Sequence, residues 1–215
     1  TAVQRDSVVS QAKLLNYVPR SSRAPSATIN LTVHQVSDTS LTLPKFTAFL
    51  SEAIDGVNYN FVTTDSQTVS VSSNTATFTG VAIKQGQPVT TTFLVNSTQN
   101  PKYLFQLPQD NVDTTTLQVL VQESTSNSTS TPYTQASNYL TLDGNSNVYF
   151  LQAAQDNKYE VLFGDNVLGR RPQNGATIKA EYRVVAGEPA NGINAFSCDI
   201  SLGIINGGTV NMGTI

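Results

Sequence analysis

Several residue types that carry chemistry in proteins are almost absent from this 215-residue chain, which has one cysteine, one histidine and no tryptophan. With Cys198 as the single cysteine, we expect no intramolecular disulfide and no thiolate metal cluster. Charged residues make up only 13% of the chain, and the formal net charge is −3. Because this balance provides no basic stripe that would neutralise phosphates, we expect no nucleic-acid partner.

Long apolar runs are missing as well. No stretch has the roughly 18 apolar residues that a bilayer-spanning helix needs, so we expect a soluble chain with no membrane partner. Residues 1–20 also lack the charged start and apolar stretch of a signal peptide. A first residue of threonine, directly ahead of a helix-like run, suggests either a portion of a longer polypeptide or a chain from which processing has removed a leader.

Uncharged polar residues fill the gap that the charged residues leave. Many Thr and Val residues suit a pleated surface, and abundant Asn, Asp, Gly and Ser suit the turns between short strands. The composition therefore predicts a mainly β fold with a short N-terminal helix. Within residues 6–17, Val8, Ala12 and Leu15 recur at helical spacing before Pro19 ends the pattern.

The chain divides in sequence into four predicted segments. Residues 1–25 form the helix and a connecting loop, and residues 26–122 form an antiparallel β-sandwich or barrel-like domain. Residues 123–137 are too polar to bury and are predicted to be a mobile surface loop. Residues 138–215 form a β-hairpin region that leads into further chain or a bound partner.

Alternation of apolar and polar residues locates the strands. In residues 28–36, Ile29, Leu31 and Val33 alternate with polar residues, which is typical of a half-buried strand. Two hairpins are predicted after the polar loop. One joins 139–142 to 148–151, and the other joins 159–163 to 177–184.

The connection within the second hairpin contains three glycines, Gly164, Gly169 and Gly175. We expect them to hold conformations that most residues cannot adopt. Replacing Gly164 or Gly175 by valine should disturb the hairpin, because a β-branched residue is costly where φ is positive. The adjacent Arg170 and Arg171 would contact an acidic surface or phosphate, or else form a solvated tip or a salt-bridging pair.

Candidate catalytic and metal-binding residues are few. His34 is the only histidine and lies in a predicted strand, so no catalytic triad can be assembled. Acidic pairs close in sequence raise the possibility of glycoside hydrolysis, but predicted turns explain them better. These pairs are Glu52/Asp55, Asp110/Asp113 and Glu160/Asp165.

A calcium loop is a poor match to the residues that follow Asp143. The glycine is misplaced, and Ala154 stands where the closing glutamate belongs. We therefore expect no enzymatic activity, no cofactor, no metal and no small-molecule substrate.

Two stretches resemble a known family. Residues 1–24 read TAVQRDSVVSQAKLLNYVPRSSRA, and residues 159–182 read YEVLFGDNVLGRRPQNGATIKAEY. Both resemble the baseplate wedge protein of T-even-type contractile phages, and the second also resembles baseplate J-like proteins. The shared features are an aromatic-Gly-Asp turn, a Pro-x-x-Gly turn and a strand that ends in tyrosine. Residues 43–49 match less well, because Phe46 stands where a glycine is commoner.

The resemblance implies a structural subunit located in the virion, in the tail baseplate. Copies of such a protein join other wedge subunits into a ring around the tail tube, which rearranges when sheath contraction is triggered. No enzymatic residues come with the family. The candidate interface and turn residues are Phe163, Gly164, Asp165, Gly169, Arg170, Arg171, Pro172, Gly175 and Tyr182.

Two alternative functions stay open from the residues alone. A carbohydrate-binding β-sandwich of a tail spike or cell-surface protein would fit the polar β composition and exposed tyrosines. A glycoside hydrolase rests only on the scattered carboxylates. Saturable binding of a sugar would favour the first alternative, and loss of turnover on mutating one acidic residue would favour the second.

Overall fold

The computed structural model describes residues 20–124, 126, 128–137, 139–154, 156–198 and 210–213, without the side chains of 139 and 210–213. Strands dominate, as the composition predicted, and the described residues contain only two short 3-10 helices, η1 (Tyr139–Thr141) and η2 (Glu188–Ala190). The predicted N-terminal helix within 1–25 lies outside the described residues. No helix among the described residues is long and apolar enough to cross a membrane.

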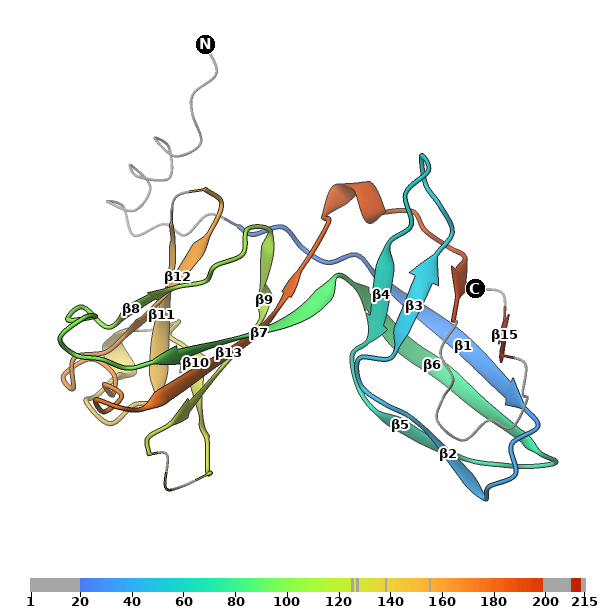
Figure 1. Ribbon diagram of the computed structural model, residues 1–215, viewed down its shortest axis with the longest axis horizontal. Coiled ribbons are helices and arrows are strands. Elements are labelled where there is room, and N and C mark those ends of the chain that lie inside the picture. Colours follow the sequence, from blue (N-terminus) through green and yellow to red (C-terminus); the bar gives the residue numbers. More distant parts are fainter. Residues whose placement is uncertain are drawn as a thin grey trace, which may run out of the picture. The chain divides into compact units, whose positions relative to one another are not determined.

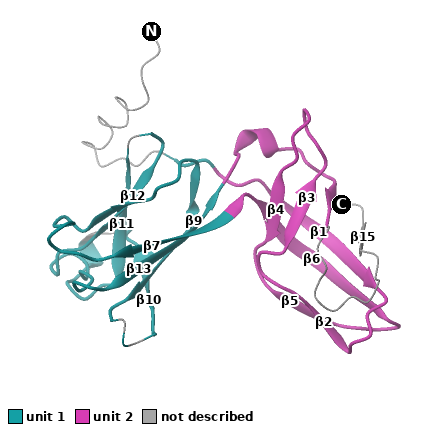
Figure 2. Ribbon diagram, viewed as in Figure 1, with its two compact units in different colours: residues 1–22, 88–184 teal, residues 23–87, 185–215 magenta. Residues whose placement is uncertain are grey.

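The chain folds into two compact units (Figure 2). Unit 1 comprises Thr1–Ser22 and Pro88–Val184, and unit 2 comprises Arg23–Gln87 and Val185–Ile215. Most of unit 1 is thus inserted in sequence between the two segments of unit 2. The structure divides the chain differently from the four predicted segments, since residues 88–122 belong with the polar segment and the strands after it.

Unit 2 is built on a six-stranded sheet with the order β14-β3-β4-β6-β1-β15 and a separate β2-β5 ribbon (Figure 1). Its strands are β1 (Ser26–His34), β2 (Ser40–Leu43), β3 (Ala48–Ser51), β4 (Asn60–Thr63), β5 (Gln67–Ser70), β6 (Thr75–Gln85), β14 (Phe196–Ser197) and β15 (Val210–Gly213).

The core of unit 2 lies between the sheet and the ribbon. The predicted alternation in β1 is confirmed, because Ile29, Leu31 and Val33 are all buried. They join one cluster with residues of the ribbon, such as Leu41, and with fully buried phenylalanines such as Phe78. Burial of this apolar surface is the main stabilising contribution available to the unit.

Unit 1 contains a nearly closed, barrel-like sheet with the order β7-β13-β9-β10-β11-β12-β8 (Figure 1). Its strands are β7 (Gln87–Leu94), β8 (Leu104–Gln106), β9 (Val112–Gln122), β10 (Thr131–Gln135), β11 (Val148–Ala153), β12 (Tyr159–Phe163) and β13 (Thr177–Val184). Strands β10 and β11 pair in parallel, whereas β11, β12 and β8 pair antiparallel.

The core of unit 1 is rich in tyrosine. A single cluster fills the barrel-like sheet and combines aliphatic residues with Phe105, Phe163 and several tyrosines. Its buried tyrosines are Tyr103, Tyr133, Tyr149, Tyr159 and Tyr182. Each brings a hydroxyl group that must find a partner or lie unbonded in the interior.

Both predicted hairpins are wrong. Strand β12 pairs with β11 and β8, while β13 lies beside β9 and β7, so 159–163 and 177–184 are not neighbours. Residues 139–141 form η1 and not a strand. The alternation of apolar and polar residues identified the strands but not which strands pair with each other. The pairing depends on how the sheet closes into a barrel-like form.

The prediction of a loop throughout 123–137 is also wrong at its end. Residues Thr131–Gln135 form β10, in which only Tyr133 is buried. The strand is held by backbone pairing to β9 on one side and to β11 on the other. A strand that buries one side chain carries almost no hydrophobic pattern in its sequence.

Candidate functional site

The predicted interface residues lie mostly in the connection from β12 to β13, residues 164–176, at one end of unit 1. Asp165 fixes the first turn, because its Oδ1 accepts hydrogen bonds from the backbone N–H groups of Val167 and Leu168, both at 2.9 Å. These bonds lower the pKa of Asp165 below its ordinary value, the one from Leu168 contributing most. The carboxylate thus organises the turn.

A second loop, residues 143–147, interlocks with this connection. Asp143 accepts a hydrogen bond from the hydroxyl of Ser146 at 2.8 Å, which is the largest cause of its lowered pKa. The backbone N–H of Gly169 donates to the Asp143 carbonyl at 2.9 Å, and that of Arg170 donates to the Ser146 carbonyl at 2.8 Å. Two backbone hydrogen bonds therefore join the two loops. Asp143 serves turn geometry, as the sequence predicted.

Glycine is required at Gly164 for lack of space. A Cβ atom there would lie 2.1 Å from the carbonyl oxygen of Gly169, and Gly164 is not among the glycines with positive φ. Gly144 is similar, since its Cβ would lie 2.1 Å from the carbonyl oxygen of Asn166. Gly169 and Gly175 do have positive φ, of 88° and 86°. The prediction of positive φ is therefore confirmed at Gly175 and wrong at Gly164.

The two adjacent arginines have different surroundings. Arg170 forms an ion pair with Glu123, with 3.2 Å between Nη2 and Oε1. The same glutamate accepts a hydrogen bond from the backbone N–H of Gln173 at 2.9 Å. Arg170 is thereby tied to the end of β9, and the salt-bridging alternative describes it correctly.

Arg171 instead lies over an aromatic ring. Its guanidinium carbon is 4.7 Å from the centroid of Tyr103, and its Nε donates to the Gly164 carbonyl at 3.3 Å. Its backbone N–H donates to Asn166 Oδ1 at 2.8 Å. The side chain is held at two points and belongs to the surface of the loop.

Phe163 and the end of the connection anchor the loop to the barrel core. The Phe163 ring packs edge-on against Phe105 and Tyr133, with centroid distances of 5.9 and 5.5 Å. Pro172 is buried. Gly175 donates its backbone N–H to the Val95 carbonyl at 2.8 Å. These residues attach the loop to the core of the barrel-like sheet.

Tyr182 does not belong to this loop. It is buried in β13, where its hydroxyl hydrogen-bonds Thr91 at 2.8 Å and donates to Gln109. Burial raises its pKa, and the Thr91 bond opposes that effect. Tyr182 therefore contributes to the packing of the sheet.

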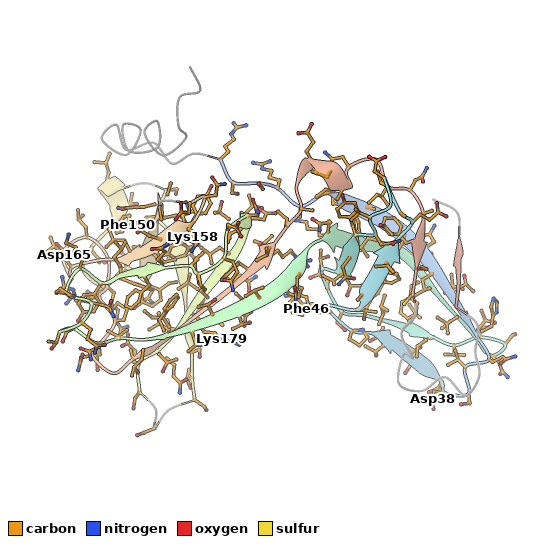
Figure 3. The ribbon with its side chains drawn as sticks, turned by 45° about the horizontal axis from the view of Figure 1, so that its top comes forward. Asp38, Phe46, Phe150, Lys158, Asp165 and Lys179 are labelled. Carbon is orange, nitrogen blue, oxygen red and sulfur yellow. The ribbon has the colours of Figure 1, made fainter. Side chains whose placement is uncertain are left out.

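The loop region has an exposed apolar tip and, beside it, a groove of mixed polar and apolar lining. Val167 and Leu168 project from the Asp165 turn with exposed fractions of 69% and 45%. Beside them lies an open groove of about 540 Å³, which the outward-facing Phe150 and Leu162 line together with loop residues. In Figure 3, Phe150 and Asp165 mark the strand and the loop that border it.

Sequence reasoning missed several residues that hold this surface together. Tyr103 supports Arg171, Glu123 binds Arg170, and Gly144 admits the second loop. Glu123 was assigned to a polar loop and Gly144 to a turn. Of these residues, only Gly144 could have been found from the sequence, because glycine is the residue that permits a close approach of two backbone segments.

The residues considered for catalysis lie in ordinary structural settings. His34 lies in β1, and its Nδ1 is 3.4 Å from the hydroxyl of Thr75. Asp113 is buried in β9 and accepts hydrogen bonds from the backbone and hydroxyl of Thr115. Among the described residues, no group of three or more His, Cys, Asp or Glu side chains could hold a metal ion.

Comparison with known proteins adds one relative. The chain is 29% identical to the baseplate wedge protein gp6 of Enterobacteria phage T4 over 213 residues, which covers 92% of this chain. It spans 31% of the length of that relative. No family model matches the chain. The similarity supports a relation to phage baseplate proteins.

Proposed function

We propose that the chain is a structural subunit of a contractile-tail baseplate wedge. It assembles with other wedge subunits and with copies of itself into a ring around the tail tube, and it rearranges when sheath contraction is triggered. The observation that carries this proposal is the similarity to a baseplate wedge protein across 92% of the chain. The similarity is not confined to one motif.

The geometry of the 164–172 loop supports the proposal. Exposed apolar side chains sit on a backbone that Asp165, Gly164 and the 143–147 loop fix in place. A surface that is already ordered loses little conformational entropy when a neighbour binds it. Such a surface suits a subunit that makes many repeated contacts in a closed ring.

The proposal includes no catalysis and no cofactor. The oxygen atoms of Asp165 and Asp143 that the sequence offered for chemistry accept hydrogen bonds from their own turns. In this proposal the surface binds neighbouring subunits through amide, hydroxyl and apolar groups and catalyses no reaction. The proposed partners are other baseplate proteins, with no role for nucleic acid or membrane.

Immunogold electron microscopy tests this function directly. Antibodies raised against the purified chain should label the baseplate of virions of the phage that encodes it, both before and after sheath contraction. Virions of an unrelated contractile phage serve as the control. Label on the capsid or on tail fibres, with none on the baseplate, would refute the proposal.

A further inference from the structure

We infer that the groove beside the 164–172 loop binds an extended segment of a partner protein that carries a carboxylate next to a large apolar side chain. Arg171 is the residue that receives the carboxylate. The inference rests on the proposed function, because it specifies the chemistry of one partner of the same surface.

The floor of the groove is an apolar row on the outer face of the sheet. Phe150 of β11 and Leu162 of β12 are directly paired, and both face outward between buried neighbours. Leu168 extends the row from the loop. The outer face of an antiparallel sheet usually carries polar side chains. An apolar row there, next to an exposed loop, favours a partner with a large apolar side chain.

Arg171 borders this floor with its terminal nitrogens available. The ring of Tyr103 and the Gly164 carbonyl hold the guanidinium through its flat face and its Nε. Among the described residues, neither terminal nitrogen of Arg171 has a hydrogen-bond partner. The two terminal N–H groups of a fixed guanidinium match the two oxygens of a carboxylate, which is the strongest form of this pair.

Arg170 does not have this role, although it is the next residue. Its guanidinium is paired with Glu123, so it is already neutralised within the unit. Two arginines that look equivalent in sequence thus divide into one that closes the loop and one that faces the groove.

The charges around the groove favour an acidic segment. Lys102 and Arg171 line it with one acid, Asp165. One oxygen of Asp165 is already bound by two backbone N–H groups. Besides these hydrogen bonds, the positive charge of Arg171 also acts on Asp165 and helps to lower the pKa of that carboxyl, so the two charges offset each other in part. Two cations against one acid leave the lining of the groove with one net positive charge. Local positive charge next to apolar surface is complementary to a carboxylate and an apolar side chain together.

Fluorescence anisotropy with the full 215-residue chain tests the inference. The probe is a fluorescein-labelled hexapeptide of alternating aspartate and leucine, and its counterpart has asparagine in place of aspartate. We expect saturable binding of the acidic probe and at least about tenfold weaker binding of the amide probe, because a charged pair is lost.

Variants locate the binding. Arg171→Gln should weaken the acidic probe about tenfold, and Arg171→Lys should recover only part of that loss, since lysine cannot form the two-point contact. Lys102→Gln should weaken binding by about threefold through charge alone. The matched control is Lys179→Gln, which removes one positive charge from β13, where Lys179 pairs with Glu181. It should bind like the unaltered chain.

Several outcomes would overturn the inference. They are no saturable binding, equal binding of the two probes, or Arg171→Gln and Lys102→Gln chains that both bind like the unaltered one. Sedimentation could also show that the chain associates with itself. If Arg171→Gln abolishes this association and the probe does not inhibit it, the groove binds a second copy of the chain and the inference is wrong. If Arg171→Gln unfolds the loop, the Lys102→Gln variant and the comparison of the acidic and amide probes still test the inference.

The immunogold result separates this inference from the proposed function. A chain that labels the baseplate but binds no probe refutes the groove assignment alone. A chain that binds the probe through Arg171 but labels another part of the virion refutes the baseplate role and leaves the groove assignment intact.

Discussion

Unit 1 and unit 2 are both β structures, but their interiors differ in chemistry. The core of unit 1 contains five buried tyrosines, whereas the buried cluster of unit 2 relies on aliphatic residues and phenylalanine. The only described tyrosine of unit 2 is Tyr59, which is partly buried. Unit 1 also carries the interlocked loops. The difference indicates that unit 2 depends on apolar packing, while unit 1 combines a tyrosine-rich core with a surface formed by hydrogen-bonded loops.

The largest expected effect comes from emptying the core of unit 2. Phe78 is fully buried, so Phe78→Ala should lower the free energy of unfolding by about 3–5 kcal/mol. Urea titration followed by circular dichroism measures this. Hydrogen exchange should accelerate in β1 and β6 more than in β9 and β13. Equal acceleration in both units would show that their cores do not respond separately.

In unit 1, the sharpest effect is expected at a surface loop. Gly164→Ala would push a methyl group against two backbone carbonyls and should cost about 3 kcal/mol. Gly175→Ala is the matched control, because its Cβ meets no atom within 4 Å and only the positive φ is strained. It should cost about 1 kcal/mol. Similar losses in thermal melts of the two variants would contradict the close packing at Gly164.

Alkaline pH should distinguish the two interiors. Burial raises the pKa of Tyr133 and of Tyr149 from 10.0 to about 12, burial being the largest cause for each. Because the folded pKa is above the unfolded one, their contribution is complete below about pH 10. It is lost as the pH rises from about 10 to about 12.

Urea titrations of the unaltered chain and of a Tyr133→Phe, Tyr149→Phe double variant test the pH effect. The double variant should lose less stability between about pH 9 and pH 11, since no phenol remains at either site to ionise in the unfolded chain. Equal losses for the two chains would show that the buried phenols do not set the alkaline limit.

The smallest expected effects concern single hydroxyl groups. Tyr182→Phe removes a hydroxyl that bonds Thr91 and Gln109 and should cost about 1 kcal/mol. The Tyr133 hydroxyl is buried with no hydrogen-bond partner among the described residues. Tyr133→Phe should therefore be neutral or stabilising by up to about 1 kcal/mol. A larger loss for Tyr133→Phe than for Tyr182→Phe in calorimetry would contradict this assignment.

The sequence predicted properties that depend on near neighbours. Alternation in β1 foretold which side chains are buried, because strand geometry places every second residue on the same face. The Asp165 turn was likewise visible in its Gly-Asp sequence. The mainly β class followed from composition.

Contacts between residues that lie far apart in the sequence could not be predicted in the same way. Residues 159–163 and 177–184 looked like a hairpin because they are close in sequence, but the barrel-like sheet separates them. The different roles of Arg170 and Arg171 depend on Glu123 and Tyr103, which lie far away in sequence. Such roles need the three-dimensional neighbours to be known.

A cryo-electron microscopy map of the intact contractile tail tests the central claim most directly. We expect the chain in the baseplate ring, with a neighbouring protein in contact with Val167, Leu168 and the groove beside Arg171. A map that places the chain outside the baseplate, or that leaves this loop surface facing solvent in every copy, would contradict the claim.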